Sequence, residues 1–495
     1  MLNALKNEIN ITYTENGAVT YRCTKSDCLD FFATAGALRK AEQAEIISRF
    51  DRAYAEDPDI AMKTLFFARD VRGGLGERRL FRVIIKHLAD SYPESVKKNI
   101  EYIAEYGRFD DLLSIIDTAC ETDAVSYIRK QMEKDINNLN QGKPISLLAK
   151  WMPSVNASNC GTVRMANKLA RAMNIKPAEY RKILSALRAE LKILENNLRE
   201  KDYTFDYSKQ PSKAMFKYRE AFRRNDGQRY SEFLQNVSKG EVKLHADTIM
   251  PYELVDPYLC EHWSSDRSFM RDISKEEQAA LNATWNALPD FSSDENAIAV
   301  VDTSGSMYCY HNPSPASVAL SLGLYFAERN KGLFHNHFIE FSSRPQLFEI
   351  KGESFADRLR YIASFNEIAD TNIEAVFKLI LDAAVRNNIS QKEMPSTLYI
   401  ISDMEFNSCI RNAAATNFQN AKTMYEAAGY KLPKVVFWNV ASRNMQQPVT
   451  MNEQGVALVS GCTPVLFSKV LSGDTDPYSF MMDIINSDRY AIIAA

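Results

Sequence analysis

The spacing of apolar residues changes character twice along the chain. Residues 10–22 hold two short β-rich arms on either side of Asn16-Gly17, the residue pair most typical of a tight hairpin turn. From residue 26 to about 250, apolar residues recur every three or four positions, which predicts helices. From about residue 295, short runs rich in Val and Ile alternate with helical segments. That alternation predicts a mostly parallel sheet covered on both faces.

The helical part is expected to consist of antiparallel helix pairs, because short polar or glycine-containing breaks separate its periodic segments. No fixed repeat period is visible, so the spacing by itself names no repeat family. The expected helices are residues 29–50, 59–71, 77–91, 96–106, 110–119, 125–138, 159–174 and 177–199.

The second half is expected to hold strands at 297–301, 335–341, 397–401, 434–440 and 456–459, and helices at 314–329, 355–364, 373–386 and 413–428. Between the halves, the proline-containing segment 251–294 is typical of a linker that also docks. The predicted organisation is a hairpin at 1–25, a helical array at 26–250, this linker, and an α/β domain at 295–495.

Composition places the chain among ordinary globular proteins. It has 495 residues, long enough for two or more domains, with 45% hydrophobic and 25% charged residues. Eight cysteines are scattered singly without a CxxC pair, which fits a reducing compartment. No secretory signal is visible and no apolar run approaches the ~20 residues of a membrane span. We therefore expect a cytoplasmic protein without a membrane partner.

Charge is divided unevenly between the two halves. Residues 1–250 carry 41 Lys/Arg and 34 Asp/Glu, a net charge of +7, whereas residues 251–495 have a net charge of −10. Residues 141–250 by themselves carry a net charge of +10. A basic half in an acidic protein suggests a surface that binds a polyanion, although a solvated helix surface explains the same count.

Hydroxyls and carboxylates follow the predicted strands of the second half. Asp302-Thr303-Ser304-Gly305-Ser306 comes directly after the first strand and has the form DxSxS. Asp370-Thr371-Asn372 opens a helix, and Asp403 follows the strand at 397–401. Ligands gather beyond the carboxyl ends of parallel strands, and such oxygen donors suit Mg²⁺. Each element alone has another explanation, because Asp after a strand is often a helix N-cap.

The helix predicted at 159–174 has one uniformly basic face. Arg164, Lys168 and Arg171 lie at positions i, i+4 and i+7, and apolar residues occupy the opposite face. Residues 136–178 contain no Asp or Glu, so these cations have no partner on their own helix, and Lys150 lies beside them. These four residues are our first candidates for binding RNA phosphates.

Two further basic segments are candidates. Segment 211–224 carries Lys213, Lys217, Arg223 and Arg224 among aromatic residues, a combination that single-stranded RNA-binding surfaces use. The alternative is that the aromatic residues belong to the core, where we also expect Trp151. Around the glycines of segment 69–79 lie Arg72, Arg78 and Arg79. This segment is not a P-loop, and turn glycines between two helices explain it better than a nucleotide site.

The oxygen-rich set resembles the metal-ion-dependent adhesion site of von Willebrand factor A domains, and the resemblance covers residues ~295–490. It implies a Rossmann-like α/β fold. It also implies that one Mg²⁺ or Mn²⁺ ion is bound, with a partner's carboxylate able to complete the coordination shell. The five metal-binding positions by this resemblance are Asp302, Ser304, Ser306, Thr371 and Asp403.

The whole arrangement resembles the Ro autoantigen (TROVE) type of RNA-binding protein. More closely, segments 71–78 (VRGGLGER), 150–154 (KWMPS), 211–214 (PSKA) and 402–406 (SDMEF) resemble an uncharacterised Ro-like family of bacteria, phages, plants and giant viruses. The resemblance implies a HEAT-like helical-repeat array that forms a ring together with the A domain. It also implies partners among small non-coding RNAs, such as Y RNAs, and misfolded RNAs.

The leading hypothesis is therefore a non-enzymatic RNA-binding scaffold whose A domain closes or regulates the ring. The runner-up is a protein adaptor whose metal site grips an acidic residue of a partner. RNA that co-purifies and is removed by nuclease would separate the two. A hydrolase is disfavoured, because the chain has six histidines and no Ser-His, Cys-His or HExxH pattern. We expect no DNA partner.

Overall fold

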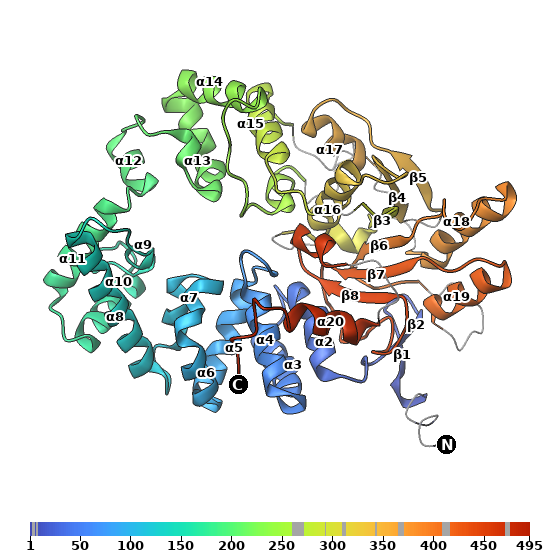
Figure 1. Ribbon diagram of the computed structural model, residues 1–495, viewed down its shortest axis with the longest axis horizontal. Helices are drawn as coiled ribbons and strands as arrows, with labels where there is room; N and C mark the ends of the chain where they lie inside the picture. The colour runs from blue at the N-terminus through green and yellow to red at the C-terminus, as the bar shows by residue number, and fades with distance from the viewer. Residues whose placement is uncertain are drawn as a thin grey trace.

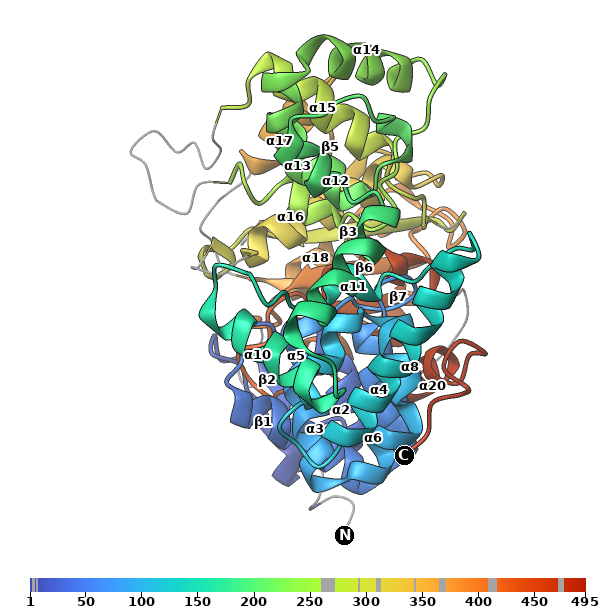
Figure 2. The ribbon, with the colours of Figure 1, turned by 90° about the vertical axis from the view of Figure 1, so that its left-hand side faces the viewer.

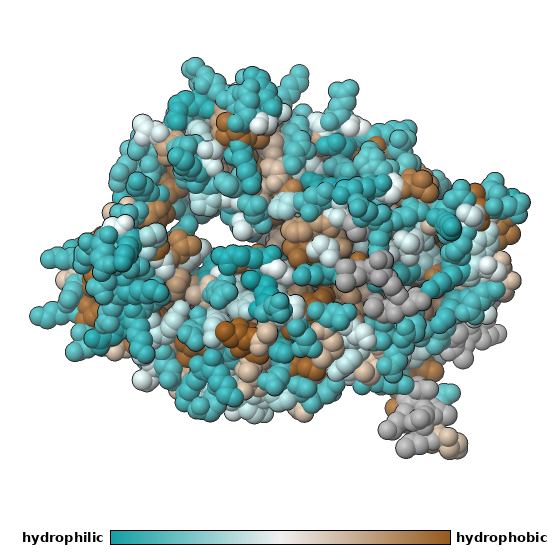
Figure 3. Space-filling model, viewed as in Figure 1, coloured by the Kyte–Doolittle hydropathy of each residue, from teal (hydrophilic) through white to brown (hydrophobic). Residues whose placement is uncertain are grey.

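The molecule is an arc of helices that leaves an α/β sheet domain on one side and returns to it on the other (Figure 1). Figure 3 shows an opening between the arc and the sheet domain. In the view turned by 90°, α10 and α11 face the viewer, with α12–α15 above them and α3, α4 and α6 below (Figure 2). This computed structural model describes residues 1, 5, 8–259, 272–292, 294–308, 313–341, 344–364, 371–407, 416–470 and 476–495.

The chain begins with the expected hairpin. Strands β1 (Ile11–Tyr13) and β2 (Val19–Tyr21) pair antiparallel, and Gly17 takes a φ of +83° in the turn between them. This positive φ explains why the turn needs a glycine. The hairpin predicted at residues 10–22 is confirmed.

The arc contains mostly short helices, and each buries one apolar face. Its helical segments are α2 (Asp27–Thr34), η1 (Ala35–Ala37), α3 (Gln43–Glu56), α4 (Pro58–Arg69), α5 (Arg78–Ser91), α6 (Pro93–Asn99), η2 (Ile100–Tyr102), α7 (Ile103–Tyr106), η3 (Phe109–Ile115), α8 (Glu121–Asn140), α9 (Leu148–Trp151), α10 (Cys160–Ala172), α11 (Pro177–Glu190), α12 (Leu194–Glu200), η4 (Tyr207–Lys209), α13 (Ser212–Asn225) and α14 (Gly227–Ser238).

Several expected helices are divided in the structure. The single helix predicted at 29–50 is wrong, because the chain turns between α2 and α3. The helices predicted at 96–106 and 177–199 are also interrupted, and the one at 110–119 is the 3₁₀ segment η3. Apolar periodicity runs across these breaks, since the residues on both sides bury side chains in the same core. Periodicity therefore located the buried face correctly and the ends of the helices poorly.

The second half forms a six-stranded sheet in the order β5-β4-β3-β6-β7-β8. Its strands are β3 (Ala297–Asp302), β4 (His337–Phe341), β5 (Gln346–Glu349), β6 (Thr397–Ser402), β7 (Lys434–Asn439) and β8 (Val456–Ser460). All neighbours pair parallel except β4 and β5, which pair antiparallel. The expected, mostly parallel sheet is confirmed, and the edge strand β5 was not predicted.

Helices cover both faces of this sheet. They are η6 (Gly305–Tyr308), α16 (Pro315–Arg329), α17 (Phe355–Ala363), α18 (Ile373–Asn387), α19 (Asn417–Ala427), η7 (Pro464–Ser468) and α20 (Pro477–Ile485). Alternate residues of β3 enter different cores: Ala299 and Val301 share one with α16, whereas Ile298 and Val300 share another with α18 and α19. The first of these cores continues without interruption into the helical arc. The arc and the sheet domain are therefore packed together rather than tethered.

The segment expected to be a linker is a packed connection in its described part. It contains η5 (Pro251–Leu254) and α15 (Lys275–Asn286), which lies between α14 and α17. Trp285 of α15 is fully buried, and its Nε1 donates to Glu328 Oε2 at 2.7 Å. This segment fastens the end of the arc to the sheet domain.

The start of the arc is fastened to the sheet domain by the chain's C-terminal residues. Helix α20 packs on α2 and α4. Beyond it, Arg489 Nη2 donates to Asp70 Oδ1 at 2.7 Å, and the Tyr490 hydroxyl donates to Asp70 Oδ2 at 2.9 Å. Asp70 is fully buried, so these donors are needed to compensate its charge. Because both ends of the arc contact the sheet domain, the molecule is a closed ring.

A close backbone approach at this junction supplies a test of ring closure. Gly36 lies against the end of β8, where an added Cβ would be 2.5 Å from the Ser460 carbonyl oxygen and 2.6 Å from Gly461 Cα. Since backbone atoms cannot move aside cheaply, we expect Gly36→Ala to separate the arc from the sheet domain. Small-angle scattering should show an expanded particle. Gly227→Ala, where the Cβ would meet nothing within 4 Å, should keep the wild-type dimensions.

Candidate functional site

The first candidate site lies where β3 and β6 end side by side. Asp302 is the last residue of β3, and Asp403 comes directly after β6, its parallel neighbour. Ser306 Oγ donates to Asp403 Oδ2 at 2.8 Å and lies 3.2 Å from Ser304 Oγ. Four of the five predicted metal ligands therefore share one hydrogen-bonded cluster at the carboxyl edge of the sheet.

Thr371, the fifth predicted ligand, is connected to the same loops. It is buried, its backbone N–H donates to Asn407 Oδ1 at 3.1 Å, and its carbonyl accepts from the Asn407 N–H at 3.0 Å. Asn407 belongs to the loop that begins with Asp403. Asp370, which precedes Thr371, lies outside the described residues. The loops that carry Thr371 and Asp403 are thus hydrogen-bonded to each other.

Asp302 is completely buried, although it stands at the end of a strand. Its Oδ2 accepts from Ser402 Oγ at 2.6 Å, and its Oδ1 accepts from the Ser304 N–H at 2.9 Å. Burial and then the charge of Asp403 raise the pKa of the Asp302 carboxyl to about 7. A carboxylate held in this way favours either a proton or a cation beside it.

This donor set fits a hard divalent cation. It offers two carboxylates and hydroxyl groups, with neither sulfur nor imidazole, which matches Mg²⁺ or Mn²⁺ better than zinc. Within the described residues, no group of three or more His, Cys, Asp and Glu side chains is placed to hold a metal. A metal at this site would therefore depend on the hydroxyls of Ser304, Ser306 and Thr371 as well as on the two carboxylates.

Proton competition gives this site a testable pH dependence. Because burial and the charge of Asp403 raise the pKa of Asp302, its carboxyl favours the protonated form at lower pH, and a metal ion that binds there must displace the proton. We therefore expect the Mg²⁺ affinity to rise by about tenfold per pH unit up to pH 7 and then to level off. Calorimetric titrations across this range would measure it. An affinity that does not change with pH would contradict the role of Asp302.

Arg443, in the loop after β7, borders this site and was not predicted. Its Nη2 donates to Asp403 Oδ2 at 2.9 Å, and its Nη1 forms an ion pair with Glu15 Oε2 at 3.0 Å. No motif marks Arg443, because it lies forty residues from Asp403 in sequence. The parallel pairing of β6 with β7 brings the two residues together.

The second candidate site is a group of cations around Trp151. The Arg108 guanidinium lies 3.9 Å from the centroid of the Trp151 ring, and Lys150 Nζ lies 5.6 Å from it. Arg78, at the start of α5, is close enough to Arg108 and Arg82 for their charges to act on it. We call Arg78, Arg108, Lys150 and Trp151 the cationic cluster. Helix α7, which ends just before Arg108, and helix α9, which ends at Trp151, border the opening in Figure 1.

Positive charge is in excess within the cationic cluster. Asp110 pairs with both Arg82 and Arg108, and Asp111 pairs with Arg82 and with the buried Arg69. Even so, partial burial of the guanidinium and then the charges of Arg108 and Arg82 lower the pKa of Arg78. A bound anion would relieve this repulsion.

Two sequence interpretations are corrected at the cationic cluster. Trp151 is not a core residue, because it is half-buried and carries a guanidinium over its ring. Arg108 was not predicted, because it is the one basic residue in segment 101–110 and belongs to no basic run. The glycines nearby act as turn residues, as expected: a Cβ at Gly74 would lie 2.0 Å from the Phe67 carbonyl oxygen.

The other predicted RNA-binding residues are spread along the arc, and several have acidic partners. The basic face of α10 is weaker than its sequence suggests, because Lys168 pairs with Asp117 and Glu121 across the helix interface. Lys213 pairs with Glu253 and Arg223 with Glu220, whereas Lys217 lies 4.8 Å from the ring centroid of its neighbour Tyr218. The remaining predicted cations, all exposed, are Arg72, Arg79, Arg164, Arg171 and Arg224.

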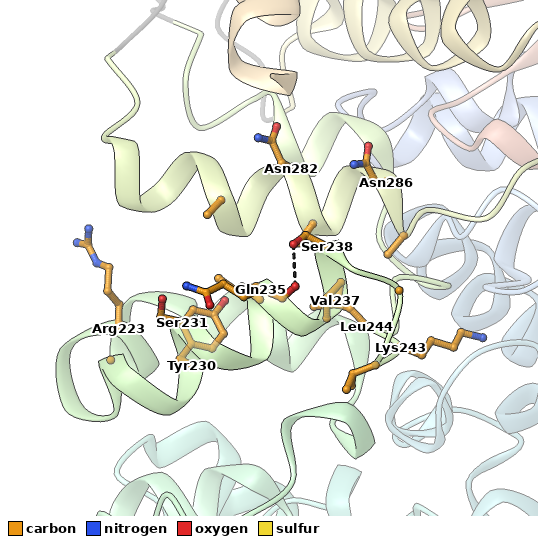
Figure 4. Close-up of a pocket in the computed structure, with 17 residues that line it drawn as sticks. Arg223, Tyr230, Ser231, Gln235, Val237, Ser238, Lys243, Leu244, Asn282 and Asn286 are labelled. Carbon is orange, nitrogen blue, oxygen red and sulfur yellow. Dashed lines mark hydrogen bonds between the residues drawn. The ribbon is translucent and has the colours of Figure 1, made fainter. Parts of the chain in front are cut away.

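A groove between α14 and α15 has a volume of about 870 Å³. Figure 4 shows Arg223 at one end and Lys243 at the other, with Gln235, Asn282 and Asn286 between them. Among the aromatic residues of segment 211–224, for which a core position was the alternative, Phe222 is fully buried and Phe216 is half-buried. The groove thus brings Arg223, one of the predicted RNA-binding residues, to an amide-lined surface.

Comparisons with known proteins identify the family. A family model described as a domain of unknown function, DUF2828, matches residues 14–130 and 124–294, which is more than half of the chain. The chain belongs to the DUF2828 family. A second domain of unknown function, DUF7788, matches residues 296–479, which include the whole six-stranded sheet.

Uncharacterized protein L728 of Acanthamoeba polyphaga mimivirus is 30% identical to this chain, over 96% of the chain and 87% of that protein. The expected kinship with a giant-virus protein is thereby confirmed. The crystal structure of the Deinococcus radiodurans Ro (RSR) protein is similar with a TM-score of 0.40 and 13% identity, over 94% of this chain and 100% of that one. In the described part of the chain, no helix combines the length and the apolar character that crossing a membrane requires.

Proposed function

We propose that this protein is a non-enzymatic RNA-binding scaffold of the Ro type. In this proposal the cationic cluster at the opening binds single-stranded segments of small non-coding or misfolded RNA. Arg78, Arg108 and Lys150 bind phosphates, while bases stack on the Trp151 ring or on the Arg108 guanidinium plane. The observation that carries the proposal is the placement of Arg108 and Lys150 beside the partly exposed Trp151 ring at the opening, with Arg78 close enough to Arg108 for their charges to interact.

The sheet domain has a second role in this proposal. We assign it to the von Willebrand A type, with one Mg²⁺ or Mn²⁺ ion held by Asp302, Ser304, Ser306, Thr371 and Asp403. Support comes from the cluster at the ends of β3 and β6 and from the raised pKa of Asp302. In this role the domain closes the ring, and its metal site takes no part in any reaction.

RNA binding can be tested with the full-length protein. Purified without nuclease, it should show an absorbance ratio at 260 and 280 nm that nuclease treatment lowers. Fluorescence anisotropy with a labelled single-stranded RNA should then give an affinity that falls as salt rises, because phosphate contacts release counterions. Absence of co-purifying RNA, together with no anisotropy change at low salt, would reject the proposal.

A metal-dependent protein adaptor is the second candidate function. It is favoured by Ser306, the one predicted metal ligand that is partly exposed to solvent. A partner carboxylate would complete the coordination shell of the ion in that case. A partner that dissociates with a chelator and resists nuclease would support the adaptor function over RNA binding.

A further inference from the structure

The N-terminal hairpin docks on the loops that border the candidate metal site. Thr14 Oγ1 donates to the Phe406 carbonyl at 2.5 Å, in the loop after β6. Tyr21 and Gln447 exchange backbone hydrogen bonds of 3.0 and 2.8 Å, in the loop after β7. The hairpin, which comes first in the chain, therefore spans the loops that carry Asp403 and Arg443.

One arginine joins the hairpin to the candidate metal site. Arg443 uses Nη2 to contact Asp403 Oδ2 at 2.9 Å and Nη1 to contact Glu15 Oε2 at 3.0 Å. The same Asp403 oxygen accepts from Ser306 Oγ at 2.8 Å. A guanidinium thus lies on the carboxylate oxygen that already contacts another predicted metal ligand. Asp403 is buried, whereas the Arg443 side chain is one-third exposed and contacts both carboxylates at once.

Arg443 and a divalent cation oppose each other at this position. Both neutralise Asp403, and their positive charges repel at the distances that a shared carboxylate imposes. Glu15 offers the same guanidinium a second carboxylate and therefore competes with Asp403 for it. Docking of the hairpin also supports the metal loops directly: Gly17 bridges to Asn407, whose backbone and side chain hold Thr371.

We propose that Arg443 is an internal competitor for the metal site and that the docked hairpin raises metal affinity by holding Arg443 on Glu15. This inference rests on the proposed metal site. Coupling between two binding equilibria is reciprocal, so a bound metal stabilises hairpin docking by the same factor. The docked hairpin and a bound divalent ion therefore stabilise each other.

Metal affinities of single variants test the direction of this coupling. Calorimetry with Mg²⁺ and with Mn²⁺ on the full chain should show that Arg443→Gln binds about tenfold more tightly than wild type. Glu15→Gln should bind about threefold more weakly, because Arg443 then keeps Asp403 as its remaining carboxylate partner. Arg443→Lys retains the charge and should stay close to wild type. Arg386→Gln removes an equal charge from an exposed position on α18 and serves as the control.

Hydrogen exchange provides the reciprocal test. Saturating Mg²⁺ should slow exchange of the Tyr21 and Gln447 amides about threefold or more in wild type, and less in Glu15→Gln. Equal metal affinities of wild type and Arg443→Gln would overturn the inference while leaving the metal site intact. So would exchange rates of the Tyr21 and Gln447 amides that do not change when Mg²⁺ binds. If neither protein binds either ion, both the metal site and this inference fail. Binding by Arg443→Gln alone would support the inference and identify Arg443 as the occupant in wild type.

Discussion

Replacing Arg78, Arg108 and Lys150 together by Gln should weaken RNA binding about tenfold or more at moderate salt. The log–log dependence of affinity on salt should flatten by about two units, since each phosphate contact on a single strand contributes about 0.7. Fluorescence anisotropy of a labelled single-stranded RNA over a series of salt concentrations measures both quantities. The effect should be large because Arg108 and Lys150 lie beside one aromatic ring at the opening and Arg78 lies close to Arg108.

A control variant that loses the same charge elsewhere distinguishes a defined RNA-binding site from general electrostatic attraction of RNA. Arg129, Lys130 and Lys134 are exposed cations of α8, and changing all three to Gln lowers the net charge equally. This control should leave the salt dependence close to that of wild type. Equal losses in both triple variants would mean that RNA is held by the overall field of the basic half, which would contradict a defined site.

Replacing Asp302 by Asn should reduce Mg²⁺ affinity by more than about a hundredfold, because even residues that only support ligands change affinity by 10–100-fold. Asn keeps an acceptor for the Ser304 N–H, and its amide can donate to the Ser402 hydroxyl, so the loop should keep its shape. Asp302→Ala would leave both donors without a partner inside the fold, and is therefore the poorer test.

The same substitution should stabilise the metal-free protein. The folded pKa of Asp302, about 7, lies above the unfolded value of about 3.9, so the folded state binds the proton more tightly. The stabilisation that the protonated Asp302 carboxyl gives the folded state is therefore lost as pH rises from about 4 to 7. An Asn side chain does not titrate, so the variant avoids this loss. Above pH 7, metal-free Asp302→Asn should melt at a higher temperature than metal-free wild type. Mg²⁺ should raise the melting temperature of wild type alone. An Mg²⁺-dependent shift in the variant would contradict the assignment.

The candidate metal site was largely predictable from sequence because its donors follow strands that β-rich runs make visible. Asp302 and Asp403 come after two such runs, and parallel pairing of β3 with β6 was enough to bring them together. The burial of Asp302 was not predictable in this way. It depends on Ser402 and on the packing around the strand end, which no local pattern specifies.

The cationic cluster was predictable in part. Arg78 and Lys150 stood out by their neighbours in sequence, whereas Arg108 and the exposure of Trp151 depend on how η3 and α9 pack in the arc. The sequence also overstated the basic face of α10, since the acidic partners of Lys168 come from a segment fifty-one and forty-seven residues earlier. Helical periodicity reports which face of a helix is buried, and it carries no information about charges that approach from another helix.

The most direct test of the proposed function is to find where RNA touches the protein. Ultraviolet cross-linking of a single-stranded RNA to the full-length chain, followed by mass spectrometry, would locate the contacted peptides. We expect nucleotide adducts on the peptides that contain Arg108 and Lys150–Trp151, and their loss in the Arg78, Arg108 and Lys150 triple variant. Adducts confined to other surfaces, such as the groove between α14 and α15 or the sheet domain, would contradict it.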